Sequence, residues 1–474
     1  MEFKDLHELK TELSPAVVID GGLIICDAEG PPAASIDRLV RTAVFSSDPG
    51  LRDVARFVIR QTAAARGACV ASIQPLYQAR GRGECSGFTV PAINIRGMTY
   101  DVARAAIRAA MSLRVGALIF EIARSEIGYT RQRPAEYATA VLAAALRESW
   151  RGPVFLQGDH YQVNAKKFAR EPDSERDAIK SLIEESIPAG FLNIDIDAST
   201  VVDLSRPDVD QQQRLNFELT AWFTRLIRQK QPAGVTISVG GEIGEVGGKN
   251  STPEELRAFM NGYLAELRTP AGTDGLAGIS KISIQTGTTH GGIPLPDGRI
   301  AEVKIDFDVL RALSRIAREE YGLAGAVQHG ASTLHEEAFD HFPPTGTAEI
   351  HLATGFQNMI YDHPSFPDPL RREIHLYLEK TCAEERKEGM TDEQFLYKTR
   401  KKAFGPFKKQ LWDLPAGVRE AITRDLEARF ALLYRKLAVT DTAEMVANHV
   451  PLVTVPAPLP AHLAGEEGGR TARR

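Results

Sequence analysis

The sequence predicts an α/β protein whose main domain is a (β/α)8 TIM barrel, a closed ring of eight parallel strands surrounded by helices. The first observation is a count. Eight short apolar runs alternate with helix-like segments between residues 89 and 353, and such a barrel needs eight strand–helix units and about 250 residues. The second is that chemically active residues follow several different runs. A doubly wound open sheet also alternates, but it gathers its site at one switch point, so we favour the barrel.

Residues 1–85 precede the regular pattern and are expected to form an N-terminal cap segment without a site of its own. They contain two short apolar segments, AVVID and LIICD, and two stretches with helical periodicity, ASIDRLVRTAVF and LRDVARFVIRQTAAAR. The glycine-rich GRGECSG ends this segment.

Residues 86–362 are expected to form the barrel, the catalytic domain. The runs predicted as strands are, in order, TVPAINI, ALIFEI, PVFLQG, FLNIDI, VTISVG, KISIQT, GAVQHG and AEIHLA. Between them lie segments with the apolar spacing of amphipathic helices: DVARAAIRAAMSL, AEYATAVLAAALRESW, ERDAIKSLIEES, QRLNFELTAWFTRLIRQ, TPEELRAFMNGYLAEL and DFDVLRALSRIAREEY.

Residues 363–455 change to charged sequence rich in helix-forming residues, including PLRREIHLYLEKTCAEERK and VREAITRDLEARFALLYRKLA. We expect a helical C-terminal extension packed on the barrel or on a neighbouring subunit. Residues 456–474 are rich in proline and glycine and are expected to be a disordered tail.

The composition favours small-molecule chemistry. The 474 residues carry a net charge of −5 from 57 basic and 62 acidic side chains, and they form no basic stripe for nucleic acid or polybasic patch for a membrane. The four cysteines have neither the spacing of a disulfide framework nor that of a thiolate metal site. The N-terminus lacks a hydrophobic signal core, and no apolar run could span a bilayer. We therefore expect a cytoplasmic protein.

Histidines that follow three different predicted strands form the central pattern. His160 follows PVFLQG, His290 follows KISIQTGTT and His329 follows LAGAVQ. A single histidine at a strand end is usually hydrogen-bonded to the backbone, but three at one barrel mouth are harder to explain in that way. Parallel strands end on the same face of a barrel, so these imidazoles would meet. Neutral imidazoles with an open position suit zinc best, and cobalt, manganese and iron stay open as alternatives.

Three carboxylates accompany the histidines. Asp159 precedes His160 directly and could act as a general base beside a metal ligand. Glu242 follows VTISVGG, and Asp197 ends NIDID. Either of these two could be a fourth metal ligand or a ligand at a second site; the alternative is a carboxylate that orients a ligating histidine.

The loops after the seventh and eighth strands are where this architecture usually binds phosphate. Here they contain Gly330 and Ser332, and then Thr354. Glycine exposes backbone N–H groups and the hydroxyls add donors, although ordinary helix capping would use the same residues.

Seven short motifs occur in an order that resembles the class II, metal-dependent ketose-bisphosphate aldolases. Between Phe88 and Asp362 these are VPAIN, GDH, NIDIDAS, GEIGEVGG, GTTHGG, QHGAS and HLATGFQ. The resemblance implies zinc as the cofactor, with a second or a monovalent cation as an open alternative. The implied ligands are His160, His290 and His329, with Glu242 and Asp197 as alternative metal contacts.

The resemblance also assigns roles around the substrate. It implies Asp159 as the carboxylate that handles the proton of the C4 hydroxyl and Asn94 as a substrate contact. The phosphate of dihydroxyacetone phosphate would lie at Gly291, Gly330, Ser332 and Thr354. GDHYQVN and NIDIDAS are also similar to the non-catalytic subunit of tagatose-bisphosphate aldolase, but the three histidine motifs fit the catalytic family better.

The sequence departs from the family pattern at positions close to the expected chemistry. Where the family carries acidic residues on a loop, one of them a proton carrier, this chain has Lys249 and Asn250. Glu245 is then our candidate for the second proton carrier. In the eighth strand His351 replaces a substrate-contacting asparagine.

These observations together predict a zinc-dependent class II aldolase of carbohydrate metabolism. It would cleave or form a ketose 1,6-bisphosphate, giving dihydroxyacetone phosphate and an aldehyde such as glyceraldehyde 3-phosphate. Two rivals stay open: a non-catalytic barrel that supports a partner subunit, and a metal-dependent hydrolase on the same fold. We expect a phosphorylated sugar as the partner molecule and a homo-oligomer, a dimer or a tetramer.

Overall fold

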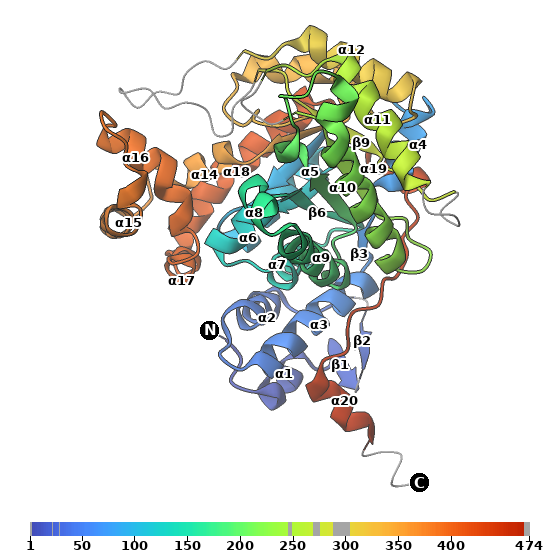
Figure 1. The fold of residues 1–474 in the computed structure, drawn as a ribbon. Helices are drawn as coiled ribbons and strands as arrows, with labels where there is room; N and C mark the ends of the chain where they lie inside the picture. The colour runs from blue at the N-terminus through green and yellow to red at the C-terminus, as the bar shows by residue number, and fades with distance from the viewer. Residues whose placement is uncertain are drawn as a thin grey trace.

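A closed ring of eight parallel strands lies at the centre of the computed structural model, which describes residues 2–20, 22–27, 29–244, 249–268, 275–287 and 304–468 (Figure 1). The ring follows the sequence order and closes where the last strand pairs with the first. This confirms the predicted barrel. Its strands are β4 (Val90–Asn94), β5 (Ile119–Ala123), β6 (Gly152–Gln162), β7 (Asn193–Asp197), β8 (Ser238–Glu242), β9 (Lys281–Ile284), β10 (Ala326–Gln328) and β11 (Glu349–Leu352).

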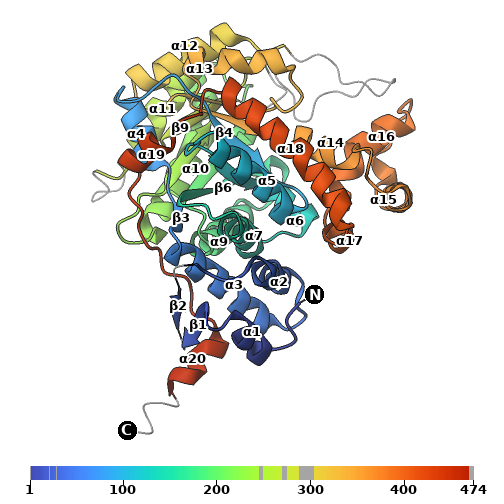
Figure 2. The same cartoon turned by 180° about the vertical axis from the view of Figure 1, so that it is seen from behind.

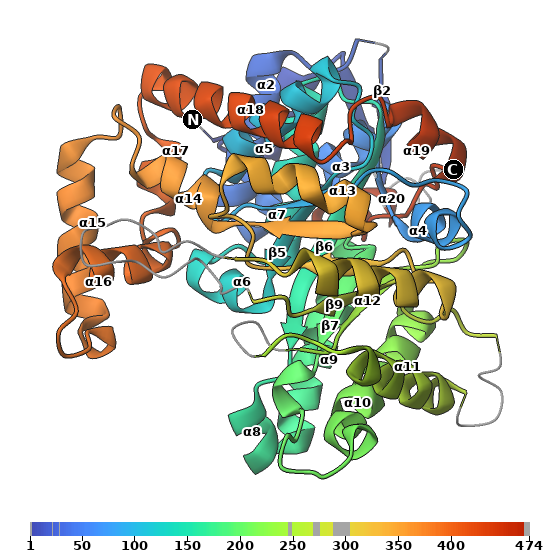
Figure 3. The same cartoon turned by 90° about the horizontal axis from the view of Figure 1, so that it is seen from above.

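Helices surround this ring and bury their apolar faces against it. Each predicted helical segment between the strands is a helix in the structure, and shorter helices are inserted after several strands (Figure 3). The helices of the barrel are α5 (Thr99–Ser112), α6 (Arg124–Thr130), α7 (Pro134–Arg147), α8 (Ala165–Arg170), α9 (Pro172–Ala189), η1 (Ser199–Val201), α10 (Val209–Lys230), α11 (Pro253–Leu267), α12 (Phe307–Glu319), η2 (Glu336–His341), α13 (Phe342–Thr345) and α14 (Thr354–Tyr361).

Strand β6 is bulged at the residues expected to do chemistry. Its pairing with β7 shifts register between Gly158 and Tyr161, and His160 between them has a φ of 40°, which is unusual for a residue other than glycine. A Cβ on Gly158 would lie 2.4 Å from the Tyr161 ring, so only glycine fits there. Bulges of this kind redirect side chains next to active sites.

The floor of the barrel is built by residues placed before the boundary that the sequence suggested at residue 85. Strand β3 (Ala68–Ala71) extends the sheet by pairing with the first half of β6. Helix α4 (Gln74–Gly81) follows, and its fully buried Arg80 donates hydrogen bonds to three backbone carbonyls. The barrel unit therefore begins near residue 68.

The rest of the N-terminal segment forms a lobe beneath α7 (Figure 1). It comprises α1 (Leu6–Leu13), β1 (Val17–Asp20), β2 (Leu23–Cys26), α2 (Ala33–Phe45) and α3 (Pro49–Ala65). Of the predicted tail, residues 456–468 are described, and Ala461–Gly468 form α20, which packs on α3 of this lobe. Its Leu463 is fully buried, which explains why a proline-rich stretch orders here.

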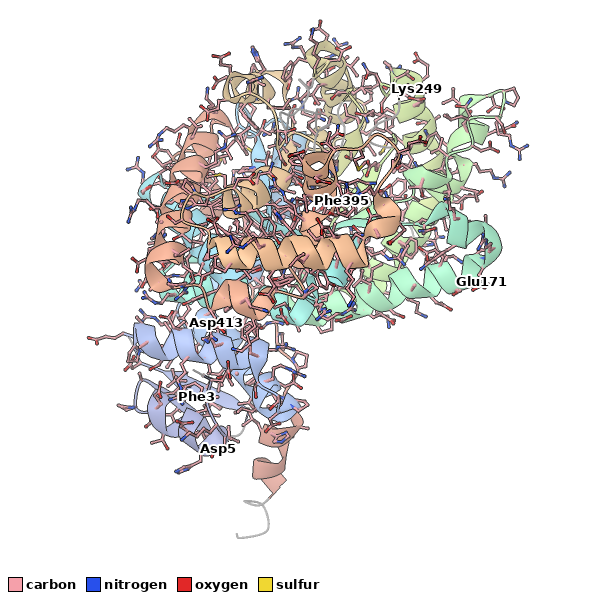
Figure 4. The ribbon with its side chains drawn as sticks, turned by 90° about the vertical axis from the view of Figure 1, so that its left-hand side faces the viewer. Phe3, Asp5, Glu171, Lys249, Phe395 and Asp413 are labelled. Carbon is pink, nitrogen blue, oxygen red and sulfur yellow. The ribbon has the colours of Figure 1, made fainter. Side chains whose placement is uncertain are left out.

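The C-terminal extension is helical, as predicted, and has two parts. Helix α18 (Ala416–Lys436) packs along α5, and its Tyr434 hydroxyl donates to the Ala106 carbonyl at 3.1 Å (Figure 2). The other part projects beside the barrel mouth, and Phe395 is buried within it (Figure 4). The remaining elements are α15 (Asp368–Thr381), η3 (Ala383–Glu385), α16 (Asp392–Thr399), η4 (Arg400–Ala403), α17 (Lys408–Trp412) and α19 (Ala443–His449). Over the described ranges, no helix has both the length and the apolar character to cross a bilayer.

Candidate metal centre

A cavity of about 1140 Å³ opens at the carboxyl ends of the barrel strands. Strand-end side chains form its floor, and helices α6 and α16 contribute to its rim. This is the face on which barrel enzymes carry their sites. Of the residues singled out from the sequence, those that line it are Asn94, Asp159, His160, Glu242, His329, Gly330, Ser332 and Thr354.

The sequence-predicted ligands His160, Glu242 and His329 lie together on this floor. Each offers a ligand atom within 4.8 Å of those of the other two, and the two imidazole rings are 4.3 Å apart between centroids. All three side chains are buried or nearly so. Two imidazoles and a carboxylate are the donor types of catalytic zinc sites, so the residues present fit a divalent metal.

Asp197 lies behind His160, where it orients the imidazole. One of its carboxylate oxygens is 2.9 Å from His160 Nδ1, and its other oxygen accepts hydrogen bonds from Ser199. Burial alone would raise the pKa of Asp197, but the hydrogen bonds from His160 and Ser199 lower it, so it is an acceptor. With Nδ1 facing Asp197, Nε2 is the nitrogen that would bind a metal, the arrangement usual for a ligating histidine. This geometry favours the orienting role over the ligand role.

Asp159 lies at the same floor, between two histidines. Its Oδ1 is 3.8 Å from His160 Nε2 and 3.3 Å from Nδ1 of His351 on β11. The His351 ring in turn packs against His329 with 4.0 Å between ring centroids. His351 was noted from the sequence only as a departure from the family pattern, yet it is the third imidazole that the described residues bring to the site.

Beneath these groups lies a buried ionic network that sequence reasoning missed. Lys281 Nζ donates to Glu349 at 2.5 Å, to Gln157 at 2.8 Å and to Asp195 at 2.9 Å. The Tyr77 hydroxyl of α4 donates to the second oxygen of Glu349. Burial opposes ionisation of Glu349, but Lys281 and His351 hold its pKa at about 2. The sequence did contain an indication of this network, since Lys281 and Glu349 are charged residues within the apolar runs KISIQT and AEIHLA.

The Glu242 carboxylate and the His160 imidazole of the cavity floor have raised pKa values. Burial raises the pKa of Glu242 to about 8, with a further contribution from the nearby Asp197 carboxylate. Burial would lower the pKa of His160, but Asp159 and Glu242 raise it well above its usual value. At neutral pH the cluster therefore carries protons that a metal ion has to displace.

Metal affinity is accordingly expected to rise with pH. A metal binds the deprotonated forms, and the raised pKa of Glu242 lies near 8, so the dissociation constant for zinc should fall steadily from pH 6 to pH 8. The slope should approach about tenfold per pH unit for each proton displaced. Calorimetric titration of the metal-stripped chain with zinc measures the dissociation constant. Repeating the titration in buffers of different ionisation enthalpy measures the number of protons released. A pH-independent dissociation constant without proton release would contradict this expectation.

Four residues assigned to substrate binding line the same cavity, namely Asn94, Gly330, Ser332 and Thr354, and the side chains of Asn94, Ser332 and Thr354 are already hydrogen-bonded. Asn94 Nδ2 donates to Glu126 at 2.6 Å, and the Ser332 hydroxyl accepts from the Ala353 backbone N–H at 2.6 Å. Arg96, which sequence reasoning missed, is 3.2 Å from the Thr354 hydroxyl. Its guanidinium also pairs with Glu126 at 2.7 Å.

The rim carries a set of basic groups that sequence reasoning did not identify. The C-terminal extension brings Lys387, Lys398 and Lys401 over the cavity. In the described part of the chain Lys401 makes no ion pair, and burial together with the nearby Arg96 lowers its pKa. The cavity thus has an acidic, metal-fitting floor and a basic rim.

Three predicted residues, Glu245, His290 and Gly291, lie outside the described residues. Lys249, which stands where the family carries an acidic loop, pairs with Glu255 of α11 at 2.8 Å (Figure 4). It is therefore tied to the helix that follows.

This chain matches a known protein family and several solved structures. A family model described as fructose-bisphosphate aldolase class-II matches residues 79–410. No curated protein sequence matches.

Solved structures are similar to this chain at low sequence identity. The fructuronate-tagaturonate epimerase UxaE from Cohnella laeviribosi is 11% identical, with a TM-score of 0.55 over 82% of this chain and 86% of that one. A fructose-bisphosphate aldolase from Campylobacter jejuni is 15% identical, with a TM-score of 0.46 over 79% and 97%. The YdjI aldolase from Escherichia coli is 14% identical, with a TM-score of 0.40 over 73% and 99%.

The family match covers well over half of the chain and includes all eight strands of the ring together with the rim of the extension. It therefore agrees with the barrel and with the family resemblance found in the sequence. The chain belongs to the class II fructose-bisphosphate aldolase family.

Proposed function

We propose that this protein catalyses reversible aldol cleavage of a ketose 1,6-bisphosphate, giving dihydroxyacetone phosphate and an aldehyde such as glyceraldehyde 3-phosphate. One observation carries the proposal. The donor atoms of His160, Glu242 and His329 converge within 4.8 Å beside Asp159, on the floor of a cavity with a basic rim. A metal ion at the cavity floor would bind the carbonyl of a sugar. The cationic side chains of the rim would bind its phosphates.

The metal held by His160, Glu242 and His329, with His290 as the further predicted ligand, is proposed to be zinc. When bound it would act as a Lewis acid on the substrate carbonyl. Asp197 holds the His160 ring in place for this purpose through its 2.9 Å contact with Nδ1.

Asp159 is proposed to remove the proton of the C4 hydroxyl as the C3–C4 bond breaks. It lies next to His160 on the bulge of β6, so the carboxylate and the metal ligand are fixed by the same turn of backbone. Glu245 remains our candidate for the second proton carrier. Asn94, Gly291, Gly330, Ser332 and Thr354 are proposed to bind the dihydroxyacetone phosphate portion.

Lys281 is the fully buried lysine nearest this chemistry, and it is unsuited to form a Schiff base. Burial would lower its pKa, but Asp195 and Glu349 raise it above the usual value. All three of its donor positions are directed at Gln157, Asp195 and Glu349. A nucleophilic amine must be neutral and accessible, so the charge on Lys281 supports a metal-dependent route.

The proposal is tested with the purified full-length chain and fructose or tagatose 1,6-bisphosphate. We expect triose phosphate release that a chelator abolishes and zinc restores, and no covalent adduct after borohydride treatment with substrate. A trapped lysine would overturn the metal mechanism. Release of inorganic phosphate instead of triose phosphate would favour the hydrolase, and a chain that binds no metal and cleaves nothing would favour the supporting subunit. Cytoplasmic location and a homo-oligomer stay predictions.

Lys401 is expected to contribute to binding of a phosphate at the rim. Replacing it with methionine should raise KM for a bisphosphorylated ketose with little change in kcat, because the contact is the same in ground and transition states. A lost charge-assisted hydrogen bond of about 1.5–3 kcal/mol corresponds to roughly a ten- to hundredfold increase. Lys402→Met is the matched control, since Lys402 pairs with Glu385 and does not line the cavity. Equal KM values for both variants would contradict the expectation.

A further inference from the structure

His351 is a buried residue of the cavity floor with no role in the reaction proposed above. Its Nδ1 lies 3.0 Å from Glu121 Oε2 and 3.3 Å from Asp159 Oδ1. Its Nε2 lies 2.7 Å from Glu349 Oε1. A ring nitrogen has to carry a hydrogen to be attracted to a carboxylate, and here both nitrogens face one. The side chain therefore has the surroundings of a charged imidazolium, and it lines the cavity although it is only 5% exposed.

Two fully buried glutamates, Glu121 and Glu349, fix the ring in one orientation. Glu349 also accepts hydrogen bonds from Lys281 Nζ at 2.5 Å and from Gln157 Nε2 at 2.7 Å. The same amide group of Gln157 donates to Glu121 at 3.0 Å, so the two carboxylates are tied together. Because loss of one partner from a buried ionic network leaves a charge uncompensated, the ring has little freedom to turn. Its Nδ1 is held at a fixed point of the cavity floor.

Asp159 is the third carboxylate at this ring, and unlike the two glutamates it belongs to the proposed chemistry. It stands on the bulge of β6, directly before His160. The Asp159 and Glu121 carboxylates repel each other, and Nδ1 of His351 lies within 3.3 Å of both. The imidazolium offsets this repulsion and gives Asp159 Oδ1 a partner with a fixed position. Accurate placement matters for a general base, because a displacement of about 1 Å can cost about 100-fold in rate.

We propose that His351 is a positioning residue for the aldol reaction and acts through Asp159. Its anchored Nδ1 holds the Asp159 carboxylate where that group receives the proton of the C4 hydroxyl. The buried network of Glu349, Gln157 and Lys281 then serves the reaction indirectly, because it fixes His351. In this role His351 contacts neither the substrate nor a metal ion. The inference rests on the proposed function.

This role predicts that two proton transfers respond differently to a change of His351. In the proposed cleavage the C4 hydroxyl loses its proton to Asp159, the C3–C4 bond breaks with its electron pair remaining on C3, and a second acid then protonates C3. Exchange of that C3 hydrogen of dihydroxyacetone phosphate with solvent involves only the second group. A displaced Asp159 should therefore slow cleavage and leave the exchange unchanged, whereas a lost metal or a distorted floor should slow both.

Asparagine and glutamine variants of His351 separate the two sides of the ring. The amide nitrogen of asparagine lies as far along the side chain as Nδ1, and that of glutamine as far as Nε2. His351→Asn keeps a donor for Asp159, so its kcat should stay within about tenfold of the natural value, the difference between a charged and a neutral donor. His351→Gln keeps a donor for Glu349 only, and its kcat for cleavage should fall about 100-fold with KM unchanged. Both variants should exchange the hydrogen of dihydroxyacetone phosphate at the natural rate.

The zinc-loaded full-length chain is assayed for triose phosphate release from fructose or tagatose 1,6-bisphosphate, and for deuterium uptake into dihydroxyacetone phosphate by proton NMR. Bound zinc is counted by mass spectrometry and should be the same in every variant. His363→Gln is the matched control, because His363 is a buried histidine 3.3 Å from the carboxylate of Asp425 and does not line the cavity. It should retain both reactions.

Unchanged cleavage by His351→Gln contradicts the inference, and so does an equal loss of cleavage and exchange or a loss of bound zinc. If that variant does not fold, His351→Ala replaces it. Added imidazole should then restore part of its cleavage without changing the exchange, and a failure to do so rejects the positioning role. A natural sequence that cleaves neither ketose rejects the proposed function and this inference with it, whereas cleavage by the natural sequence with no selective effect of His351→Gln rejects this inference alone.

Discussion

Replacement of His329 by alanine is expected to lower kcat by at least about three orders of magnitude and to reduce bound zinc to a trace. His329 belongs to both ligand clusters of the floor, with His160 and Glu242 on one side and with Asp159 and His351 on the other. Its ring is buried between the other two imidazoles. A catalytic metal contributes several kcal/mol to the transition state, and about 4 kcal/mol corresponds to roughly 10³-fold in rate.

The measurement combines triose phosphate release with metal analysis of the same preparation. His335→Ala is the matched control, because His335 is exposed and does not line the cavity, and it should retain both activity and zinc. A His329→Ala protein that kept stoichiometric zinc and normal turnover would exclude His329 as a ligand. Loss of activity with full retention of zinc would instead place His329 in contact with substrate.

The barrel could be predicted because its signal is local and repeated. Runs such as TVPAINI and PVFLQG are short, apolar and bounded by turn residues, and parallel strands buried on both faces require this pattern. The helices between them have regularly spaced apolar residues, and in the fold these residues form the faces that pack against the strands. The contribution of β3 and α4 to the barrel was not predicted, because these elements join it through long-range contacts. An example is the hydrogen bond from Arg80 to the Thr347 carbonyl, which no local sequence pattern encodes.

The site could be predicted in part for the same reason. His160, Glu242 and His329 end or follow parallel strands, so the architecture brings them together once the strands are identified. The orienting contact of Asp197 depends on a bulge in β6, and the register of a bulge is not visible in sequence. His351 and Glu349 alternate on β11 as polar residues in an apolar strand, a signal that was present but was used only as a departure from the family.

The basic rim could not be predicted from sequence. Lys387, Lys398 and Lys401 lie in a charged segment whose helical periodicity indicates solvent-exposed faces. Their position over the cavity results from how the extension docks beside α6 and α14 (Figure 3). Docking of this kind depends on tertiary packing around buried residues such as Phe395 and Phe404, and periodicity does not specify it.

Replacing Lys281 with methionine is expected to destabilise the protein by about 3–5 kcal/mol, the cost of breaking a buried ion pair. The Lys281 side chain is 1% exposed, and its ammonium neutralises Glu349 and Asp195, which are buried and slightly exposed respectively. Methionine fills the volume of the lysine, so the loss reflects two uncompensated carboxylates and not a cavity. Urea unfolding at pH 8 measures the difference. Lys230→Met is the control, because its partner Glu184 is on the surface and an exposed pair contributes at most about 1 kcal/mol.

The pH dependence of that loss identifies its cause. Burial already raises the pKa of Asp195 to about 6 beside Lys281, and without Lys281 it should rise further. The pKa of Glu349, which Lys281 and His351 hold at about 2, should then rise above its unfolded value, because burial acts with less compensation. A carboxyl group with a raised folded pKa destabilises the fold above that pKa and ceases to do so once it is protonated in both states. The difference between the variant and the natural sequence should therefore shrink as the pH falls from 8 to 5. Adding Glu349→Gln to Lys281→Met should recover part of the stability at pH 8, since it removes one of the two charges. A deficit that is constant with pH and unaffected by Glu349→Gln would mean that Lys281 acts through packing and not through charge.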